Sequence, residues 1–407
     1  MTKKSDAPAI RFKGFSDAWE QRKLGELVDR VVRKNTNNES TLPLTISAQY
    51  GLVDQITYFN NRVASRDVSN YYLVLNGEFA YNKSTSDGYP FGAVKRLDLY
   101  EKGVLSTLYI VFAPKKEQQI DSDYLTVFFD TDRWHKGVAE RAAEGARNHG
   151  LLNISAEDFF DIDLSVPKDI VEQKQIGAFI RQLDNLITLH QRKFEKLTNV
   201  KKSMLEKMFP QNGSSYPEIR FKGFTDPWEQ RKLGELALFN PKDELPQTFE
   251  YVDLESVVGT EMLSHRTEVK SSAPSRAQRL AHTGDLFYQT VRPYQKNNYL
   301  FEKPDNNYVF STGYAQMRPY VDGYFLLSLV QSERFVKVVL DNCTGTSYPA
   351  INANDLAEIE VAAPSDESEA RKIGTIFRSI DNLITLHQRE LEKLQNIKKS
   401  MLEKMFV

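Results

Sequence analysis

The chain has 407 residues, 41% of them hydrophobic and 27% charged, a composition typical of globular protein with room for two or three cores. Its single cysteine, Cys343, excludes an internal disulfide and a thiolate-rich metal cluster. The net charge of −2 gives no support to non-specific nucleic-acid binding, so any DNA-binding face must be local. The first residues, MTKKSDAPAI, lack the apolar core of a signal peptide and no apolar run reaches membrane-spanning length, so we expect a cytoplasmic protein.

The chain opens with a block of sequence that returns in its second half. Residues 10–27 read IRFKGFSDAWEQRKLGEL, and residues 219–236 read IRFKGFTDPWEQRKLGEL. A variable segment follows each copy, at about 28–165 and 237–362. The two segments share little beyond short matches such as GEFAY beside GDLFY. We interpret this as a common frame that carries two inserts with separate jobs.

Each variable segment is predicted to be a mixed α/β globule, because β-rich runs punctuated by Gly, Pro and Asn are followed by an apolar-patterned helix. The predicted elements are strands at 71–75 and 106–112 with a helix at 122–143, and strands at 249–254 and 316–320 with a helix at 324–340.

A second repeated block closes each half and predicts a long helix. LDNLITLHQRKFEKLTNVKKSMLEKMF at 183–209 returns at 380–406 with few changes, displaced by 197 positions and free of Pro and Gly. Apolar residues recur on seven-residue spacing in two rows, which is typical of a coiled-coil seam. The predicted seam residues are Ile176, Ile180, Leu183, Ile187, His190, Phe194, Leu197 and Met204 in the first helix, and Ile373, Phe377, Ile380, Ile384, His387, Leu391, Leu394 and Met401 in the second.

The seam has a polar residue at one equivalent position of both helices, His190 and His387. Two interpretations remain open. Each imidazole could lie partly exposed at an edge of the seam, or the two could fix the axial alignment of the helices, as a seam Asn does in coiled coils.

The sequence carries no motif for a catalysed reaction. Phosphate-loop, dinucleotide-binding, zinc-protease and nucleophile-elbow patterns are absent, and so is the tetrapeptide with which amino-methyltransferases hold a flipped base. The nearest match is a nuclease-like set, Asp253 with Glu268 and Lys270, which could hold a divalent cation. Such a match is expected by chance in a chain this rich in charge. We therefore expect a binding protein with no catalytic residue and no metal site.

The repeated RFKGF-x-D-x-W-E-x-R-K-L-G-E-L opening and the repeated DNLITLHQR…KKSMLEKMF helix, framing two unlike globules, resemble the specificity subunit of bacterial type I restriction-modification systems over essentially the whole chain. The resemblance implies an α+β fold in which two target recognition domains are separated by two long antiparallel coiled-coil helices, with a pseudo-two-fold internal repeat. The expected domains are a first target recognition domain at 1–171, a long helix at 172–209, a Pro-, Gly- and Ser-rich linker at 210–218, a second target recognition domain at 219–369 and a second long helix at 370–407.

The resemblance also implies a non-catalytic subunit that reads a bipartite, asymmetric sequence of double-stranded DNA, one half with each domain. The implied partners are two methyltransferase subunits, which use S-adenosylmethionine to methylate adenine, and motor-nuclease restriction subunits. No cofactor is expected on this chain. A scaffold whose coiled coil joins two adaptor domains without binding DNA remains the alternative.

Candidate DNA-binding residues are polar or basic side chains in loops after strands, where they can reach base edges and phosphates. They are Lys83, Ser84, Thr85, Tyr89, Arg147 and Asn148 in the first globule, and Arg276, Arg279, Arg292, Tyr294, Lys296, Asn297 and Tyr348 in the second.

Overall fold

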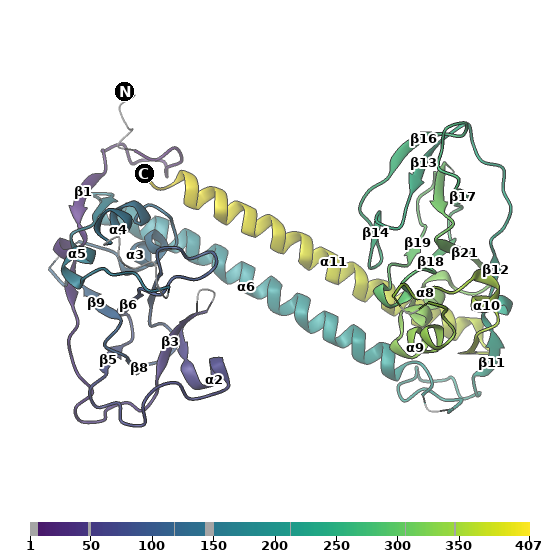
Figure 1. Cartoon of the computed structure of the whole chain (residues 1–407), viewed down its shortest axis with the longest axis horizontal. Coiled ribbons are helices and arrows are strands. Elements are labelled where there is room, and N and C mark those ends of the chain that lie inside the picture. Colours follow the sequence, from purple (N-terminus) through teal and green to yellow (C-terminus); the bar gives the residue numbers. More distant parts are fainter. Residues whose placement is uncertain are drawn as a thin grey trace. The chain divides into compact units, whose positions relative to one another are not determined.

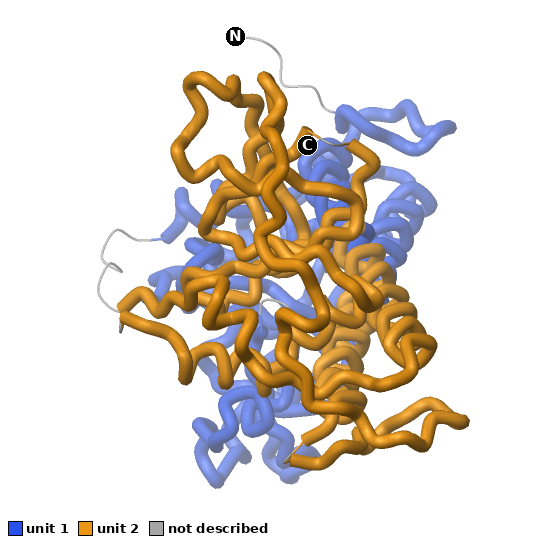
Figure 2. The backbone as a smooth tube through the Cα atoms, turned by 90° about the vertical axis from the view of Figure 1, so that its right-hand side faces the viewer, with its two compact units in different colours: residues 1–189, 390–407 blue, residues 190–389 orange. Residues whose placement is uncertain are grey.

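The computed structural model of the chain describes residues 7–47, 50–117, 119–142, 150–211, 213–305, 307–345 and 347–407. It divides into two compact units, coloured in Figure 2: unit 1 comprises residues 1–189 and 390–407, and unit 2 comprises residues 190–389 (Figures 1 and 2). Each unit therefore combines one opening block and one variable segment with parts of both long helices. Among the described residues, no helix has both the length and the apolar character needed to cross a membrane.

Unit 1 contains an antiparallel sheet of strand order β2-β9-β6-β7. Strand β1 of the opening block pairs with β10, which leads into the first long helix. The elements of the globule are β1 (Glu20–Lys23), α1 (Leu24–Leu27), β2 (Val28–Arg30), β3 (Leu44–Ser47), β4 (Gly51–Asp54), α2 (Gln55–Phe59), β5 (Tyr72–Leu75), β6 (Phe79–Asn82), β7 (Ala93–Arg96), β8 (Lys102–Leu105), β9 (Ile110–Pro114), α3 (Ser122–Phe129), α4 (His135–Arg141), α5 (Ala156–Phe160) and β10 (Asp163–Val166).

Unit 2 repeats this sheet and this strand pair, with an antiparallel sheet of order β12-β21-β18-β19 and a pairing of β11 with β22. The remaining strands differ, since unit 1 has the two-stranded sheets β3-β4 and β5-β8. A second sheet has the order β16-β13-β20-β17. The elements of the globule are β11 (Glu229–Lys232), α7 (Leu233–Leu236), β12 (Ala237–Phe239), β13 (Thr248–Val252), β14 (Val257–Val258), β15 (Glu261–Met262), β16 (Arg266–Val269), β17 (Ala277–Leu280), β18 (Leu286–Gln289), η2 (Pro293–Gln295), β19 (Tyr299–Leu300), β20 (Tyr308–Ser311), β21 (Tyr314–Pro319), α8 (Gly323–Gln331), α9 (Glu333–Asp341), α10 (Ala353–Ala357) and β22 (Glu360–Ala363).

The predictions of one continuous helix at 122–143 and another at 324–340 are wrong, because each region forms two helices. In unit 1, Thr131 Oγ1 donates a hydrogen bond to the carbonyl of Phe128 (2.6 Å) at the C-terminal end of α3, and the chain turns before α4 begins. In unit 2, Ser332 adopts an extended backbone (ψ 144°) and its hydroxyl accepts from Phe335 N (3.3 Å), so it ends α8 and caps α9.

The predicted long helices are present as α6 (Ile170–Lys207) and α11 (Glu367–Lys404), each two or three residues earlier than expected. They pair antiparallel: in unit 2, His190 contacts His387, and further along α6 Lys201 contacts Asp381, which comes earlier in α11. Every predicted seam residue of both helices is buried or half-buried, and the positions between them are mostly exposed. The residues on seven-residue spacing therefore lie on the face along which the two helices pack.

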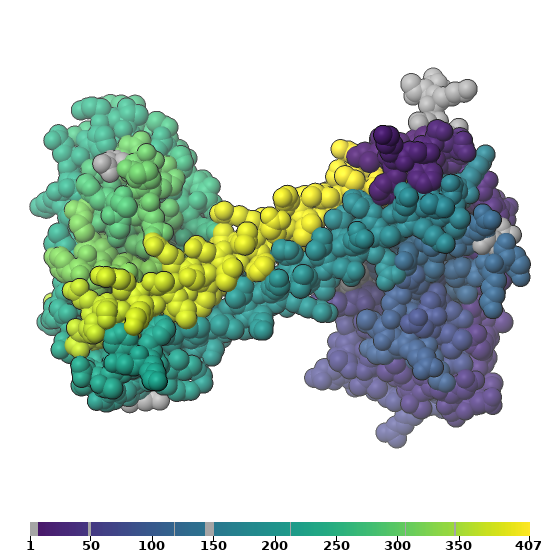
Figure 3. Space-filling view, turned by 180° about the vertical axis from the view of Figure 1, so that it is seen from behind, coloured from purple at the N-terminus to yellow at the C-terminus, as the bar shows by residue number. Residues whose placement is uncertain are grey.

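The opening block meets the start of the long helix inside each unit through an ion pair whose glutamate is buried. Arg11 of the opening block donates two hydrogen bonds to Glu172 of α6 (2.6 and 2.8 Å), and Arg220 does the same to Glu369 of α11 (2.7 and 2.8 Å). In unit 1, Ile10 N also donates to the carbonyl of Lys404 (3.0 Å), so the N-terminal segment lies against the end of α11 (Figure 3).

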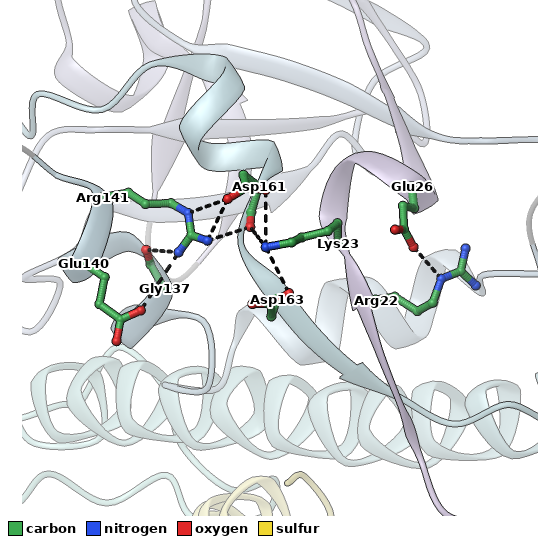
Figure 4. A network of polar contacts seen from close by, with 8 residues as sticks. All are labelled: Arg22, Lys23, Glu26, Gly137, Glu140, Arg141, Asp161 and Asp163. Atoms are coloured by element: carbon green, nitrogen blue, oxygen red, sulfur yellow. Dashed lines mark hydrogen bonds and ion pairs between the residues drawn. The ribbon is translucent and has the colours of Figure 1, made fainter.

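A second polar network fixes the edge of unit 1 where the opening block meets α4 and β10 (Figure 4). Lys23 Nζ lies 3.2 Å from the carboxylates of both Asp161 and Asp163, and Arg141 donates to Asp161 (2.8 Å). These hydrogen bonds, first from Arg141 and then from Lys23, lower the pKa of Asp161. The network holds the end of α4 on the shared frame.

Candidate nucleic-acid interface

Two loops meet at the end of β6 in unit 1. Residues 83–92 follow β6, and residues 150–154 precede α5. Thr85 N and Thr85 Oγ1 both donate to the carbonyl of Gly150 (2.6 and 3.1 Å), and Leu152 N donates to the carbonyl of Lys83 (2.9 Å). This short ladder joins segments that lie far apart in the sequence.

Unit 2 joins the same two loops in the same way. Residues 290–298 follow β18, the strand equivalent to β6, and residues 347–352 precede α10, the helix equivalent to α5. Arg292 N donates to the carbonyl of Pro349 (2.8 Å), and Ile351 N donates to the carbonyl of Thr290 (3.1 Å). We call these segments the paired loops of each unit. Their backbone bridges correspond although their sequences do not.

The structure brings four of the predicted residues of the first globule together on the paired loops of unit 1. Ser84 is exposed, and Lys83, Thr85 and Tyr89 are half-buried. The ammonium group of Lys83 reaches the carbonyl of Ile154 (3.4 Å), and Tyr89 closes a tight turn by donating its N–H to the carbonyl of Ser86 (2.9 Å). Arg147 and Asn148 lie outside the described residues.

Five predicted residues of the second globule lie on the paired loops of unit 2. Tyr294 and Tyr348 are 49% and 62% exposed, so both can meet a ligand. Arg292 lies with its guanidinium carbon 4.3 Å from the centre of the Tyr348 ring. Lys296 pairs with Glu333 (2.8 Å), and Asn297 accepts a hydrogen bond from Gly259 N (2.8 Å), so these two side chains hold the loop in place.

The backbone of residues 290–298 takes a conformation that ordinary side chains disfavour. Arg292 and Lys296 have φ values of 54° and 56°, in the left-handed region. Two buried amides support it: Gln289 Nε2 donates to the carbonyl of Val291 (2.6 Å), and Asn298 Oδ1 accepts from Gln289 N (2.9 Å). Strained backbone held by surrounding structure often marks a binding site.

Sequence reasoning missed Gln289 and Asn298 as supports of this loop. One signal was available, because the matched GEFAY and GDLFY strands are each followed by an amide, Asn82 and Gln289. Asn82 Oδ1 accepts from Ser84 N (3.0 Å), so an amide shapes the start of the loop in both units.

The two remaining candidates, Arg276 and Arg279, lie on or beside β17. Arg276 is exposed and near the paired loops, because its carbonyl accepts from Thr312 N (2.8 Å) while the adjoining Gly313 accepts from Thr290 N (3.0 Å). Burial lowers the pKa of the half-buried Arg279 guanidinium. Arg279 lies within β17, where it is paired with Phe310 of β20.

The nuclease-like set is occupied by an arginine. Arg266 donates to Asp253 (2.6 Å) and to Glu268 (2.9 Å), and Lys270 instead lies 3.8 Å from Glu244. Burial raises the pKa of Asp253, but hydrogen bonds from Arg266 and Ser256 bring that pKa below its ordinary value. The described residues contain no cluster of three His, Cys, Asp or Glu side chains that could hold a metal ion.

Two α/β globules that share one four-stranded sheet order and the same paired loops, joined by two long antiparallel helices, define a duplicated recognition protein. Residues 16–199 and 225–396 match the model of the Type I restriction modification DNA specificity domain, so the chain belongs to that family. This confirms the predicted specificity subunit and its α+β fold class, and DNA sequence recognition is the function of the family.

Two curated relatives come from Methanocaldococcus jannaschii. The type I restriction enzyme MjaVIII specificity subunit is 24% identical, with 85% of this chain and 82% of the relative covered. The putative type I restriction enzyme MjaX specificity subunit is 21% identical, with 94% and 92% covered. The crystal structure of a type I restriction-modification S subunit from M. genitalium has the same fold, with a TM-score of 0.63 at 14% identity over 98% of this chain and 99% of that one.

Proposed function

We propose that this chain is the DNA-reading subunit of a type I restriction-modification complex and itself catalyses no reaction. It binds a bipartite, asymmetric duplex sequence in the cytoplasm, one half-site with each globule. Two methyltransferase subunits, carrying S-adenosylmethionine, then methylate adenine in that sequence, and restriction subunits join to cleave unmodified DNA.

The observation that carries the proposal is the recurrence of the paired loops. Both units hold the same two loops together with corresponding backbone hydrogen bonds, yet Thr85 stands in one where Arg292 stands in the other. Base identity is read by side chains, whereas backbone geometry sets how they are presented. One frame with unlike readers therefore suits two unlike half-sites.

We expect the two methyltransferase subunits to dock on exposed leucines of the long helices. Leu186 and Leu189 of α6 are 44% and 45% exposed, and the equivalent Leu383 and Leu386 of α11 are 44% and 51% exposed. These leucines lie off the seam in both copies of the repeat. We expect the double changes Leu186→Glu with Leu189→Glu, and Leu383→Glu with Leu386→Glu, each to remove one methyltransferase subunit from the purified complex, whereas Val200→Glu on α6 should remove none.

The decisive experiment maps methylated adenines in the genome of cells that express this chain with its methyltransferase. The expected result is one split motif, and exchanging residues 237–362 for the corresponding segment of another specificity subunit should alter one half only. A scaffold that does not bind DNA would give no motif. In a binding titration with duplex DNA, such a scaffold would also show no steep dependence on salt, which phosphate contacts would produce.

A further inference from the structure

Arg292 and Tyr348 form a stacked pair across the paired loops of unit 2. The guanidinium carbon lies 4.3 Å from the ring centre, a contact in which a planar cation rests on an aromatic face. One residue comes from each loop, and two backbone interactions flank the pair: the bridge of Val291 with Ala350 and the hydrogen bond from Arg292 N to Pro349 (2.8 Å). The position of the guanidinium is therefore set by both loops together.

Arg292 is half-buried, and its guanidinium is without a hydrogen-bond acceptor among the described residues. In the described residues around it, no carboxylate or carbonyl accepts from the Arg292 side chain, whereas two other cations of unit 2 are paired, Lys296 with Glu333 and Arg266 with Asp253. Stacking uses the face of the planar group and leaves its N–H donors at the edge. Tyr348 is 62% exposed, so the stacked pair lies at the surface.

We propose that Arg292 reads a guanine in the half-site bound by unit 2, with Tyr348 as its positioning residue; this rests on the proposed function. A guanidinium fork matches the O6 and N7 acceptors that guanine presents in the major groove. The left-handed backbone at Arg292 and the stack on Tyr348 fix the fork before DNA arrives, which lowers the entropy lost on binding.

Unit 1 offers the matched control at the equivalent position. Thr85 takes the place of Arg292, and both its N–H and its hydroxyl donate to Gly150. A short hydroxyl that is already engaged cannot supply a two-donor fork. The guanine reading at this position therefore belongs to unit 2 alone.

The test uses the complex of the full chain with its methyltransferase and compares methylation motifs between variants. Arg292→Lys keeps the charge but loses the fork, so it should relax one guanine position and leave the rest of the motif unchanged. Tyr348→Leu should relax the same position, Tyr348→Phe should preserve it because the ring remains, and Thr85→Ala should leave it unaffected. A motif without guanine in the half-site of unit 2 overturns the proposal.

A chemical probe of the base separates guanine reading from phosphate contact. Replacing the read guanine by 7-deazaguanine removes the N7 acceptor and should weaken binding of the wild-type complex by about 5- to 150-fold, with no further loss for Arg292→Lys. Arg292→Lys that binds the intact site as tightly as wild type would show that the planar fork is not needed, and Arg292→Ala that weakens every sequence alike would indicate a phosphate contact. Either result overturns the reading. A wild-type complex that selects no sequence would instead overturn the proposed function itself.

Discussion

At the scale of single residues, Arg220 joins the second opening block to the long helix α11. Its fork donates to Glu369, whose side chain is 1% exposed, so Arg220→Ala would leave a buried carboxylate without its partner. We expect a loss of about 3 kcal/mol in the stability of unit 2, measured by urea denaturation of the full chain. Because Arg11 and Glu172 repeat the pair, Arg11→Ala should destabilise unit 1 by a similar amount.

Arg231 provides a matched control for this change. It lies in the same repeated block and pairs with Glu235 (3.2 Å), but the two side chains are 37% and 52% exposed. Arg231→Ala should therefore change stability by no more than about 0.5 kcal/mol. Equal effects of Arg220→Ala and Arg231→Ala would show that burial of the glutamate is not the cause.

The pair of histidines on the seam should make the stability of unit 2 depend on pH. His190 and His387 approach through their Nδ1 atoms at 3.1 Å, and burial, then the charges of His190 and Lys193, lower the pKa of His387. The unfolded chain therefore binds this proton more readily than the folded chain. Stability should fall as the pH drops below the ordinary histidine pKa of about 6.5, until the lower pKa of the folded state is passed.

Denaturation curves of the wild type and of the double variant His190→Asn with His387→Asn, taken between about pH 7.5 and 5, test this dependence. Asn keeps a polar contact in the seam but does not titrate. The stability difference between the two proteins should change across this range, because the remaining histidines are common to both. A constant difference would contradict the assignment.

At the scale of single elements, a glycine allows each long helix to pack closely against a helix of its globule. A Cβ on Gly374 of α11 would collide with Asp322 Oδ1 and lie 2.9 Å from Phe325 N, the atoms that cap α8. Gly177 of α6 has the same relation to α3, with Tyr124 N at 2.8 Å. Both copies of the helix therefore pack against the N-terminal turn of a globule helix.

Gly374→Ala reverses the usual effect of this substitution. In an open helix, alanine would stabilise by about 1 kcal/mol, but here the added methyl group should destabilise unit 2 by about 1 to 3 kcal/mol. Thr375→Ala, at the next and exposed position, should lie within about 0.5 kcal/mol of wild type. Thermal denaturation would show the contrast, and a stabilised Gly374→Ala variant would mean that α8 can shift away.

The long helices could be predicted from the sequence to a greater extent than the paired loops of the candidate site. Seam spacing predicts which residues of α6 and α11 are buried, since a helical period depends only on local geometry. The helices end near Thr131 and Ser332 because these side chains form local hydrogen bonds within apolar runs. The spacing of apolar residues contains no signal for such helix ends. The paired loops join segments more than fifty residues apart, such as Thr85 with Gly150, and only the fold brings these together.

At the scale of the whole molecule, each unit is completed by the end of the other repeat's helix. Phe406, 3% exposed, packs in unit 1 with its ring centre 6.2 Å from that of Trp19 and 5.6 Å from that of Tyr124. Phe209 does the same in unit 2, 5.9 Å from Trp228 and 5.7 Å from Phe325. The two halves of the sequence therefore cannot fold as independent consecutive domains with these cores intact.

Phe406→Ala should destabilise unit 1 by about 3 to 5 kcal/mol, because a buried aromatic ring is lost from its core. Hydrogen exchange should accelerate in α3 and remain unchanged in α8. This is expected even though Phe406 and α8 belong to the same half of the sequence and α3 belongs to the other half. Phe209→Ala is the matched variant, and it should accelerate exchange in α8 and leave α3 unchanged. The same response of both helices to either variant would contradict this exchange of helix ends.

Under the proposed function, the length of the helix pair should set the spacing between the half-sites. Duplicating residues 191–197 in α6 together with 388–394 in α11 adds one heptad to each helix and keeps the seam continuous. Each helix grows by about 10.5 Å, which matches about three base pairs at 3.4 Å each. The methylated motif should keep both half-sites and gain about three base pairs of spacer.

Binding to duplexes whose spacer is varied one base pair at a time measures this change. The affinity for the new optimum should be weaker than that of wild type for its own site, because three added base pairs also rotate one half-site by more than a quarter turn about the duplex axis. Duplicating the heptad in α6 alone is the control, and it should abolish sequence-specific binding because the helices then differ in length. A motif that keeps its original spacer in the doubly lengthened chain would show that some other feature sets the distance.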